Sequence, residues 1–226
     1  MNNKTSRLLV VLIGLICVLY LINSFVLGRF FTRPRTVRTD VLQGVLIGYG
    51  LSFVTINIFA RIKVVKKING WTTTLGSSEP GNGMFLRAAH TMILPGPVNV
   101  PKEAVYWTTF KDGAGHTLSG VHNYLMHFPP DGLPPNNAFW SLTMGDGQNR
   151  FVANPINRYS VSDRTGLVQN ADGSTDIYIQ NTAPVGHESN WLPAPSGNFI
   201  LWLRAYLPGQ AILDGEYEVP PVVEVR

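Results

Sequence analysis

The residues best suited to chemistry lie in or near one stretch, Ala138–Tyr159, which reads AFWSLTMGDGQNRFVANPINRY. The guanidinium group of Arg158 can present a planar fork of donors to a carboxylate or phosphate. A tryptophan ring can stack on a sugar or on another apolar ring. These properties predict a ligand site near Arg158 for a small or sugar-like molecule. The candidate residues are Trp140, Asn154, Asn157, Arg158, Tyr159 and Trp191.

The same residues also allow a purely structural interpretation. Asn-Pro and Asn-Arg segments commonly form loops in which the asparagine side chain bonds to the backbone. Arg158 could likewise pair with Asp163 or Asp172. The sequence leaves a ligand site and a structural loop as alternatives.

Catalytic arrangements are weakly indicated. Ser141, His122 and Asp146 could be drawn as a hydrolase triad, but the chain has no G-x-S-x-G motif and Ser141 lies in a strand pattern. Most of the carboxylates lie in predicted turns, where aspartate caps backbone amides. A hydrolase or other enzyme with a cleft near Arg158 therefore remains the alternative to a binding module.

No metal or other cofactor is expected. The five histidines show neither an H-x-H nor an H-E-x-x-H spacing. The single cysteine, Cys17, lies inside an apolar run, so the chain offers no pair for a disulfide and no cysteine-based metal site.

The stretch Leu8–Leu27 is uncharged and is flanked by Lys4, Arg7 and Arg29. About twenty helical residues span roughly 30 Å, the thickness of a bilayer's hydrocarbon core. No A-x-A-like cleavage site follows, so we expect a retained membrane anchor rather than a removed signal peptide.

A second uncharged stretch covers 41–60 and is diluted by several polar residues. Gly44 and Gly48 have the G-x-x-x-G spacing that allows two membrane helices to approach closely. We therefore expect a second span, with a membrane helix or another copy of the chain as its partner, although glycines are common in membrane helices generally.

The chain has a net charge of +4, and its basic residues cluster at the flanks of these two stretches rather than along the folded part. Such clustering is typical of membrane topology signals and lipid headgroup contacts. We therefore expect the lipid bilayer as a partner and no nucleic acid. The expected location is the bacterial inner membrane with the folded domain outside the cytoplasm, although the charge difference between the loops leaves the orientation open.

Residues 1–68 are thus predicted to form a membrane anchor and 69–226 a separate folded domain. Met84–Leu94 has helical spacing and ends at the breaker Pro95-Gly96-Pro97, which predicts one short helix. Short β-rich runs separated by turn residues follow at 104–110, 118–128, 138–144, 174–180 and 198–206. Strands at this spacing, without helices between them, predict an all-β antiparallel sandwich or jelly roll.

The segments FWSLTM, NPINRYS, DGSTDIYIQ, NWLPAP and FILWLRAYLPG, followed by DG-x(4)-PP, resemble the domain of unknown function 1214 (DUF1214). They occur in collinear order from about Gly70 to the C-terminus. PKEAVYW at 101–107 resembles the shorter, membrane-anchored members of that family. The resemblance implies a jelly-roll-like β-sandwich and supplies no catalytic residues. The expected function is that of a membrane-anchored β-sandwich module with a ligand-binding or cell-envelope accessory role.

Overall fold

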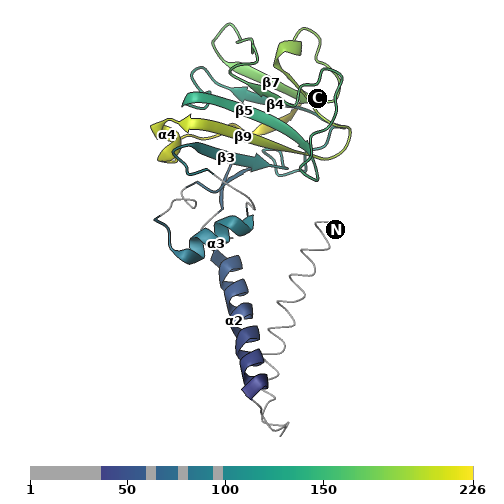
Figure 1. Cartoon of the computed structure of the whole chain (residues 1–226). Helices are drawn as coiled ribbons and strands as arrows, with labels where there is room; N and C mark the ends of the chain where they lie inside the picture. Colours follow the sequence, from purple (N-terminus) through teal and green to yellow (C-terminus); the bar gives the residue numbers. More distant parts are fainter. Residues whose placement is uncertain (1–36, 60–64, 76–80, 94–98, 226) are drawn as a thin grey trace.

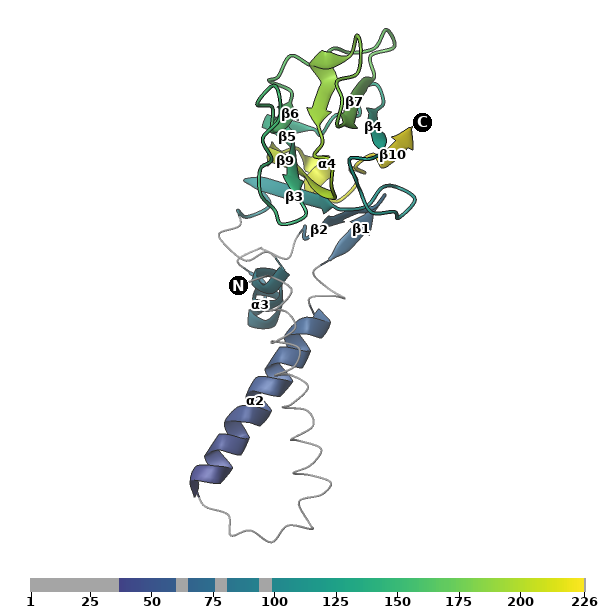
Figure 2. The ribbon, with the colours of Figure 1, turned by 90° about the vertical axis from the view of Figure 1, so that its right-hand side faces the viewer.

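Two β-sheets pack face to face, and a long helix extends away from the sandwich that they form (Figures 1 and 2). The structure is a computed structural model that describes residues 37–59, 65–75, 81–93 and 99–225. The predicted anchor at 8–27 lies outside the described residues. The predicted β-sandwich is confirmed.

The larger sheet has six strands in the order β1-β2-β3-β9-β5-β6, all antiparallel. Their bounds are β1 Lys66–Ile68, β2 Trp71–Thr73, β3 Ala104–Thr109, β9 Phe199–Pro208, β5 Asn136–Asp146 and β6 Ser160–Ser162. The smaller sheet has the order β10-β4-β7-β8. Its strands are β10 Val222–Val225, β4 Asn123–Phe128, β7 Thr175–Gln180 and β8 Trp191–Pro193.

One strand pair departs from the antiparallel prediction. Strand β8 runs parallel to β7, with Tyr178 opposite Trp191. Two parallel neighbours need a connection that returns the chain to the end at which the first strand began, and the segment 181–190 is that connection. The smaller sheet is therefore mixed.

Alternating side chains explain why these segments form strands with one buried face. In β7, Ile177 and Ile179 are fully buried while Asp176 and Tyr178 lie on the opposite face. In β9, alternate residues from Phe199 to Ala205 are buried in the same way. The two inner faces meet in one apolar core, as period-two alternation requires.

Helix α2 (Val37–Phe59) forms the extension, and helix α3 (Met84–Ile93) lies between it and the sandwich (Figure 1). The short helix predicted at 84–94 is confirmed. Ala89 of α3 is buried against Leu86 and Ile56, which joins the two helices. Two short helical turns, η3 (Glu188–Asn190) and α4 (Gln210–Leu213), complete the described elements.

The second apolar stretch is helical, as predicted, but its predicted role as a span is not supported. Within the described residues, no helix is both long enough and apolar enough to cross a membrane. Polar residues such as Ser52 and Asn57 interrupt its apolar sequence. Among the described residues outside the helix's own backbone, no atom lies within 4 Å of the point to which a Cβ at Gly44 or Gly48 would project. Their pairing with another helix stays a prediction.

Asp146 closes the Gly-Asp-Gly turn after β5. Its carboxylate accepts hydrogen bonds from the backbone N–H groups of Gln148 (2.8 Å) and Arg150 (3.0 Å). The Arg150 guanidinium adds bonds from Nε at 3.0 Å and from Nη2 at 2.8 Å. These contacts, with the Arg150 backbone bond the largest, hold the pKa of Asp146 below its ordinary value. The turn is therefore fixed by the charged form of one side chain.

We expect Asp146 to contribute to stability at neutral pH and to lose that contribution in acid. A carboxyl with a lowered folded-state pKa stabilises the protein above its unfolded pKa, and this effect disappears as the pH falls through the folded value. The free energies of unfolding of the wild type and of Asp146→Asn, measured from about pH 6 to pH 2, should therefore converge below about pH 4. A difference that stays constant over this range would contradict the assignment.

Candidate functional site

Arg158 braces a distant segment of the chain. Its Nη1 atom donates to the carbonyl oxygens of Glu188 (2.8 Å), Ser189 (3.1 Å) and Trp191 (3.0 Å). Those residues form η3 and the start of β8. The arginine fork predicted to face a ligand is therefore directed, at this nitrogen, to the protein's own backbone.

The two candidate asparagines belong to the loop that positions Arg158. The Asn154 side chain accepts from the Arg158 backbone N–H (2.9 Å) and donates to the Arg158 carbonyl (2.9 Å). Asn157 is exposed and has a φ of 50°, a left-handed conformation that asparagine tolerates better than most residues. Both residues have the contacts and conformation of a structural loop.

The candidate aromatic residues are placed in the core or on the flank of the loop. Trp140 is 1% exposed and packs against Phe128, with ring centroids 5.7 Å apart. Trp191 is 4% exposed and its Nε1 donates to the Gln180 carbonyl (2.8 Å). Tyr159 is half-buried, with its ring 5.6 Å from that of Phe151. The six predicted residues therefore do not line one shared cavity.

The segment that Arg158 holds forms the rim of a pocket that the sequence did not indicate, which we call the Tyr178 pocket. Its volume is about 200 Å³, and its lining includes Asn170, Asp176, Tyr178, His187, Ser189 and Asn190. Asp176 and Tyr178 reach it from the outer face of β7. The ring of Tyr178 stacks on that of His187, with centroids 4.6 Å apart and planes 26° apart.

Polar contacts fix the walls of the Tyr178 pocket. Asp176 Oδ1 lies 2.6 Å from His127 Nδ1, and its Oδ2 accepts from Asn170 Nδ2 at 3.0 Å. The buried side chain of Asn190 bonds to both backbone groups of Val168 (2.7 Å each) and donates to the Asp176 carbonyl at 2.8 Å. The pocket is therefore preformed, as small-molecule sites usually are.

The chemistry of the Tyr178 pocket suits a small polar molecule. Burial, with a smaller contribution from the charge of Asp176, raises the pKa of Tyr178, so its hydroxyl remains a donor at neutral pH. Asp176 and Asn170 supply acceptors, and the Tyr178–His187 pair supplies ring surface. The volume lies below the roughly 300–1,000 Å³ of sites for drug-sized ligands, which limits the ligand to a small one.

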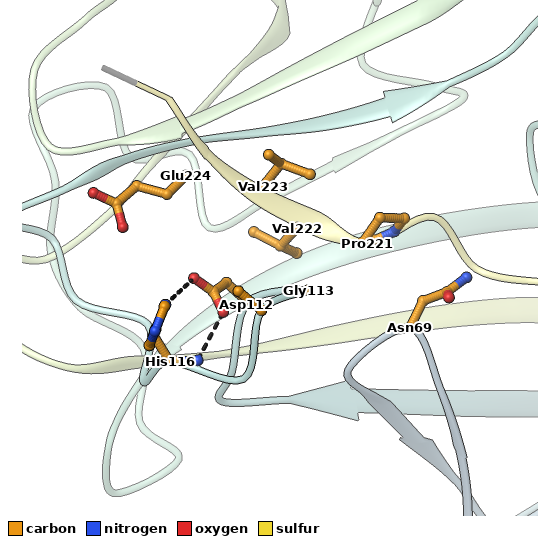
Figure 3. A pocket seen from close by; sticks show the side chains of 9 residues that line it. Asn69, Asp112, Gly113, His116, Pro221, Val222, Val223 and Glu224 are labelled. Carbon is orange, nitrogen blue, oxygen red and sulfur yellow. Dashed lines mark hydrogen bonds and ion pairs between the residues drawn. The ribbon is translucent and has the colours of Figure 1, made fainter.

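A larger hollow of about 590 Å³ lies beside β10, and we call it the β10 groove (Figure 3). It is lined by Asn69, by the loop residues Asp112, Gly113, Ala114 and His116, and by Pro221–Glu224. Asp112 is 3% exposed, and its carboxylate accepts from the His116 backbone N–H (2.7 Å) and lies 3.3 Å from His116 Nδ1. Because three distant segments build this groove, no local sequence pattern indicated it.

Metal ligands do not gather in the part of the chain that the structure describes. No group of three or more histidine, cysteine, aspartate or glutamate side chains among these residues is placed to hold a metal ion. The three close histidine–carboxylate pairs, at His116, His122 and His127, are separate pairs.

Known proteins resemble this chain in sequence and in fold. The VPA0106 protein from Vibrio parahaemolyticus is 26% identical with a TM-score of 0.65, over 86% of this chain and 47% of that one. An uncharacterized protein from Burkholderia cenocepacia is 16% identical with a TM-score of 0.43, over 87% and 46%. The chain thus spans about half the length of these proteins. No curated protein matches the sequence significantly.

The family resemblance rests on the central strands. Residues 103–210 match the profile of a family described as "Protein of unknown function (DUF1214)". This range runs from β3 through β9 and includes both the loop of Arg158 and the Tyr178 pocket. The family that the sequence motifs indicated, DUF1214, is therefore the one whose profile residues 103–210 match.

Proposed function

We propose that this protein is a membrane-anchored β-sandwich module that binds a small, sugar-like ligand in the Tyr178 pocket. The observation that carries the proposal is the preformed cavity of about 200 Å³ in which Tyr178, His187 and Asp176 converge. A polyhydroxylated ring has the donors and acceptors that Asp176, Asn170 and the tyrosine hydroxyl require. Its apolar face suits an aromatic side chain.

The membrane part of the proposal rests on the uncharged stretch Leu8–Leu27 and on the surface of α2. Large apolar side chains of α2 are exposed, among them Val41, Val45 and Leu51 at 59–62%. A helix that exposes apolar side chains on several faces is normally covered by lipid or by other helices. We propose that the anchor places the chain in a bacterial inner membrane, with the folded domain outside the cytoplasm and a second helix packed at Gly44 and Gly48.

The ligand is tested by thermal unfolding of the full chain in mild detergent with a panel of monosaccharides and amino sugars. A ligand present at 100 times its Kd should stabilise the folded state by about 2.7 kcal/mol. Tyr178→Ala should abolish this shift because it removes both the hydroxyl and the ring face. Tyr159→Ala is the matched control, since its ring lies on Phe151 outside the pocket. An equal loss in both variants, or no stabilising compound, would contradict the proposed site.

The alternative function, a hydrolase, is favoured by one contact. The 2.6 Å contact between His127 Nδ1 and Asp176 Oδ1 orients the imidazole in the manner of a general base. Turnover of the bound compound that is lost in His127→Asn, while binding persists, would favour the enzyme. Binding without any turnover in the wild type would favour the binding module.

A further inference from the structure

Strand β10 lies at the edge of the smaller sheet. Among the described strands it pairs with β4 alone, with Val222 opposite Met126 and Glu224 opposite Tyr124. On its other side, the Val222 carbonyl accepts from the Gly113 N–H at 2.8 Å. Backbone groups of residues two apart point the same way along a strand. The N–H and C=O of Glu224 therefore point away from β4 and toward the β10 groove.

The loop that meets this edge covers only its first half. Gly113 lies so close to Pro221 that an added Cβ would be 2.8 Å from the proline Cβ. Beyond that contact the loop is held by the buried carboxylate of Asp112, which bonds to the His116 backbone. The remaining half of the edge borders the groove of about 590 Å³ (Figure 3). The groove beside the second half of β10 is therefore formed by the folded loop and by the strand itself.

Among the described residues that line the groove, the fully charged side chains are the carboxylates of Asp112 and Glu224, and none is a lysine or arginine. Glu224 Oε1 lies 2.9 Å from His122 Nδ1, and the glutamate side chain remains 40% exposed. Val223, half exposed at 50%, and Pro221 add apolar surface. An open strand edge is a template for an added strand, in which backbone bonds give affinity and alternate side chains give specificity. Charge complementarity points to a basic side chain in such a strand.

We propose that the β10 groove binds an extended basic peptide, which adds to β10 as a fifth strand of the smaller sheet. The backbone of the peptide pairs with Glu224, and a lysine or arginine side chain lies near the exposed carboxylate of Glu224. Asp112, buried against His116, adds negative charge beneath it without contacting the peptide. The apolar side chains next to it rest on Val223 and Pro221. This site is separate from the Tyr178 pocket and does not depend on the sugar-like ligand.

The test measures fluorescence anisotropy of labelled heptapeptides with the full chain in detergent. The basic probe is Thr-Val-Lys-Val-Arg-Val-Thr, and the acidic probe has glutamate in place of lysine and arginine. We expect the basic probe to bind at least about tenfold more tightly, since each 1.4 kcal/mol of charge interaction is a factor of ten. Two N-methylated versions of the basic probe carry their methyl groups on the odd-numbered or on the even-numbered amides, and they test whether the peptide pairs with β10 as a strand. The version whose methyl groups block the amides that face β10 should lose binding, and the other version should keep it.

Glu224→Gln should weaken the basic probe about tenfold, whereas Glu216→Gln, at an exposed glutamate outside the groove, should leave binding unchanged. A thermal melt of each variant checks that the fold is retained. Equal binding of basic and acidic probes, or no binding of either, would overturn the proposal. Equal binding of both N-methylated probes would do the same, and so would a dimer in sedimentation that the basic probe cannot dissociate.

Discussion

Replacing Trp140 with alanine should lower the free energy of unfolding by about 3–5 kcal/mol, the range for large aromatic residues deleted from a core. The indole ring lies between the two sheets, is 1% exposed and packs against Phe128. Its removal takes away apolar contact and leaves a cavity that the neighbouring strands cannot fill without losing register. Chemical denaturation of the full chain in detergent, followed by near-ultraviolet circular dichroism, measures the effect.

Phe151→Ala provides the control for this experiment. Phe151 belongs to the same stretch of sequence but is 67% exposed, so its loss should cost less than about 1 kcal/mol. The comparison also separates two roles for Trp140. Unchanged stability in Trp140→Ala, together with lost ligand binding, would show that the ring is a stacking surface and would contradict its place in the core.

Period-two alternation predicted the strands well wherever a strand is long and has one buried face. STDIYIQ and NFILWLRAY became β7 and β9 with the expected alternation. The prediction was too long at 118–128, because β4 begins only at Asn123. Gly120 donates to the Gly197 carbonyl, and a side chain there would collide with the Pro195 backbone. That long-range contact turns 118–122 into a loop.

The short strands were beyond what local patterns can predict. Strands β1, β2, β6 and β8 each have three residues, too few to display a period of two. Their pairing comes from neighbours supplied by other parts of the chain. The same reasoning applies to the β10 groove, whose walls come from residues 69, 112–116 and 221–224.

The candidate site was harder to predict than the fold because residue type does not decide orientation. Trp140 lies on the same face of β5 as Leu142 and Met144, which are both buried, and its ring is therefore in the core. For Arg158 the sequence offered a ligand, or Asp163 or Asp172, as the partner of its guanidinium group. Its partners are carbonyl groups 30–33 residues away, which no local spacing indicates.

Arg158→Met should lower the free energy of unfolding by about 2–3 kcal/mol and open the rim of the Tyr178 pocket. A hydrogen bond from a charged donor contributes about 1.5–3 kcal/mol, but the three bonds share one nitrogen and are partly exposed, so their contributions do not simply add. Methionine keeps the apolar stem and removes only the donors. Faster amide hydrogen exchange in residues 186–191 would locate the effect.

Arg150→Met is the matched control for this arginine. Arg150 also bonds to a neighbour, Asp146, but that ion pair lies on the surface with the arginine side chain 67% exposed, so its loss should destabilise the protein much less than the loss of Arg158. The pair of variants separates bracing from ligand contact. If Arg158 braced the pocket rim, Arg158→Met would reduce both stability and ligand binding, because the segment carrying Ser189 would move. If Arg158 touched the ligand, binding would fall while the unfolding free energy and the exchange of 186–191 stayed at their wild-type values, and the bracing role would be refuted.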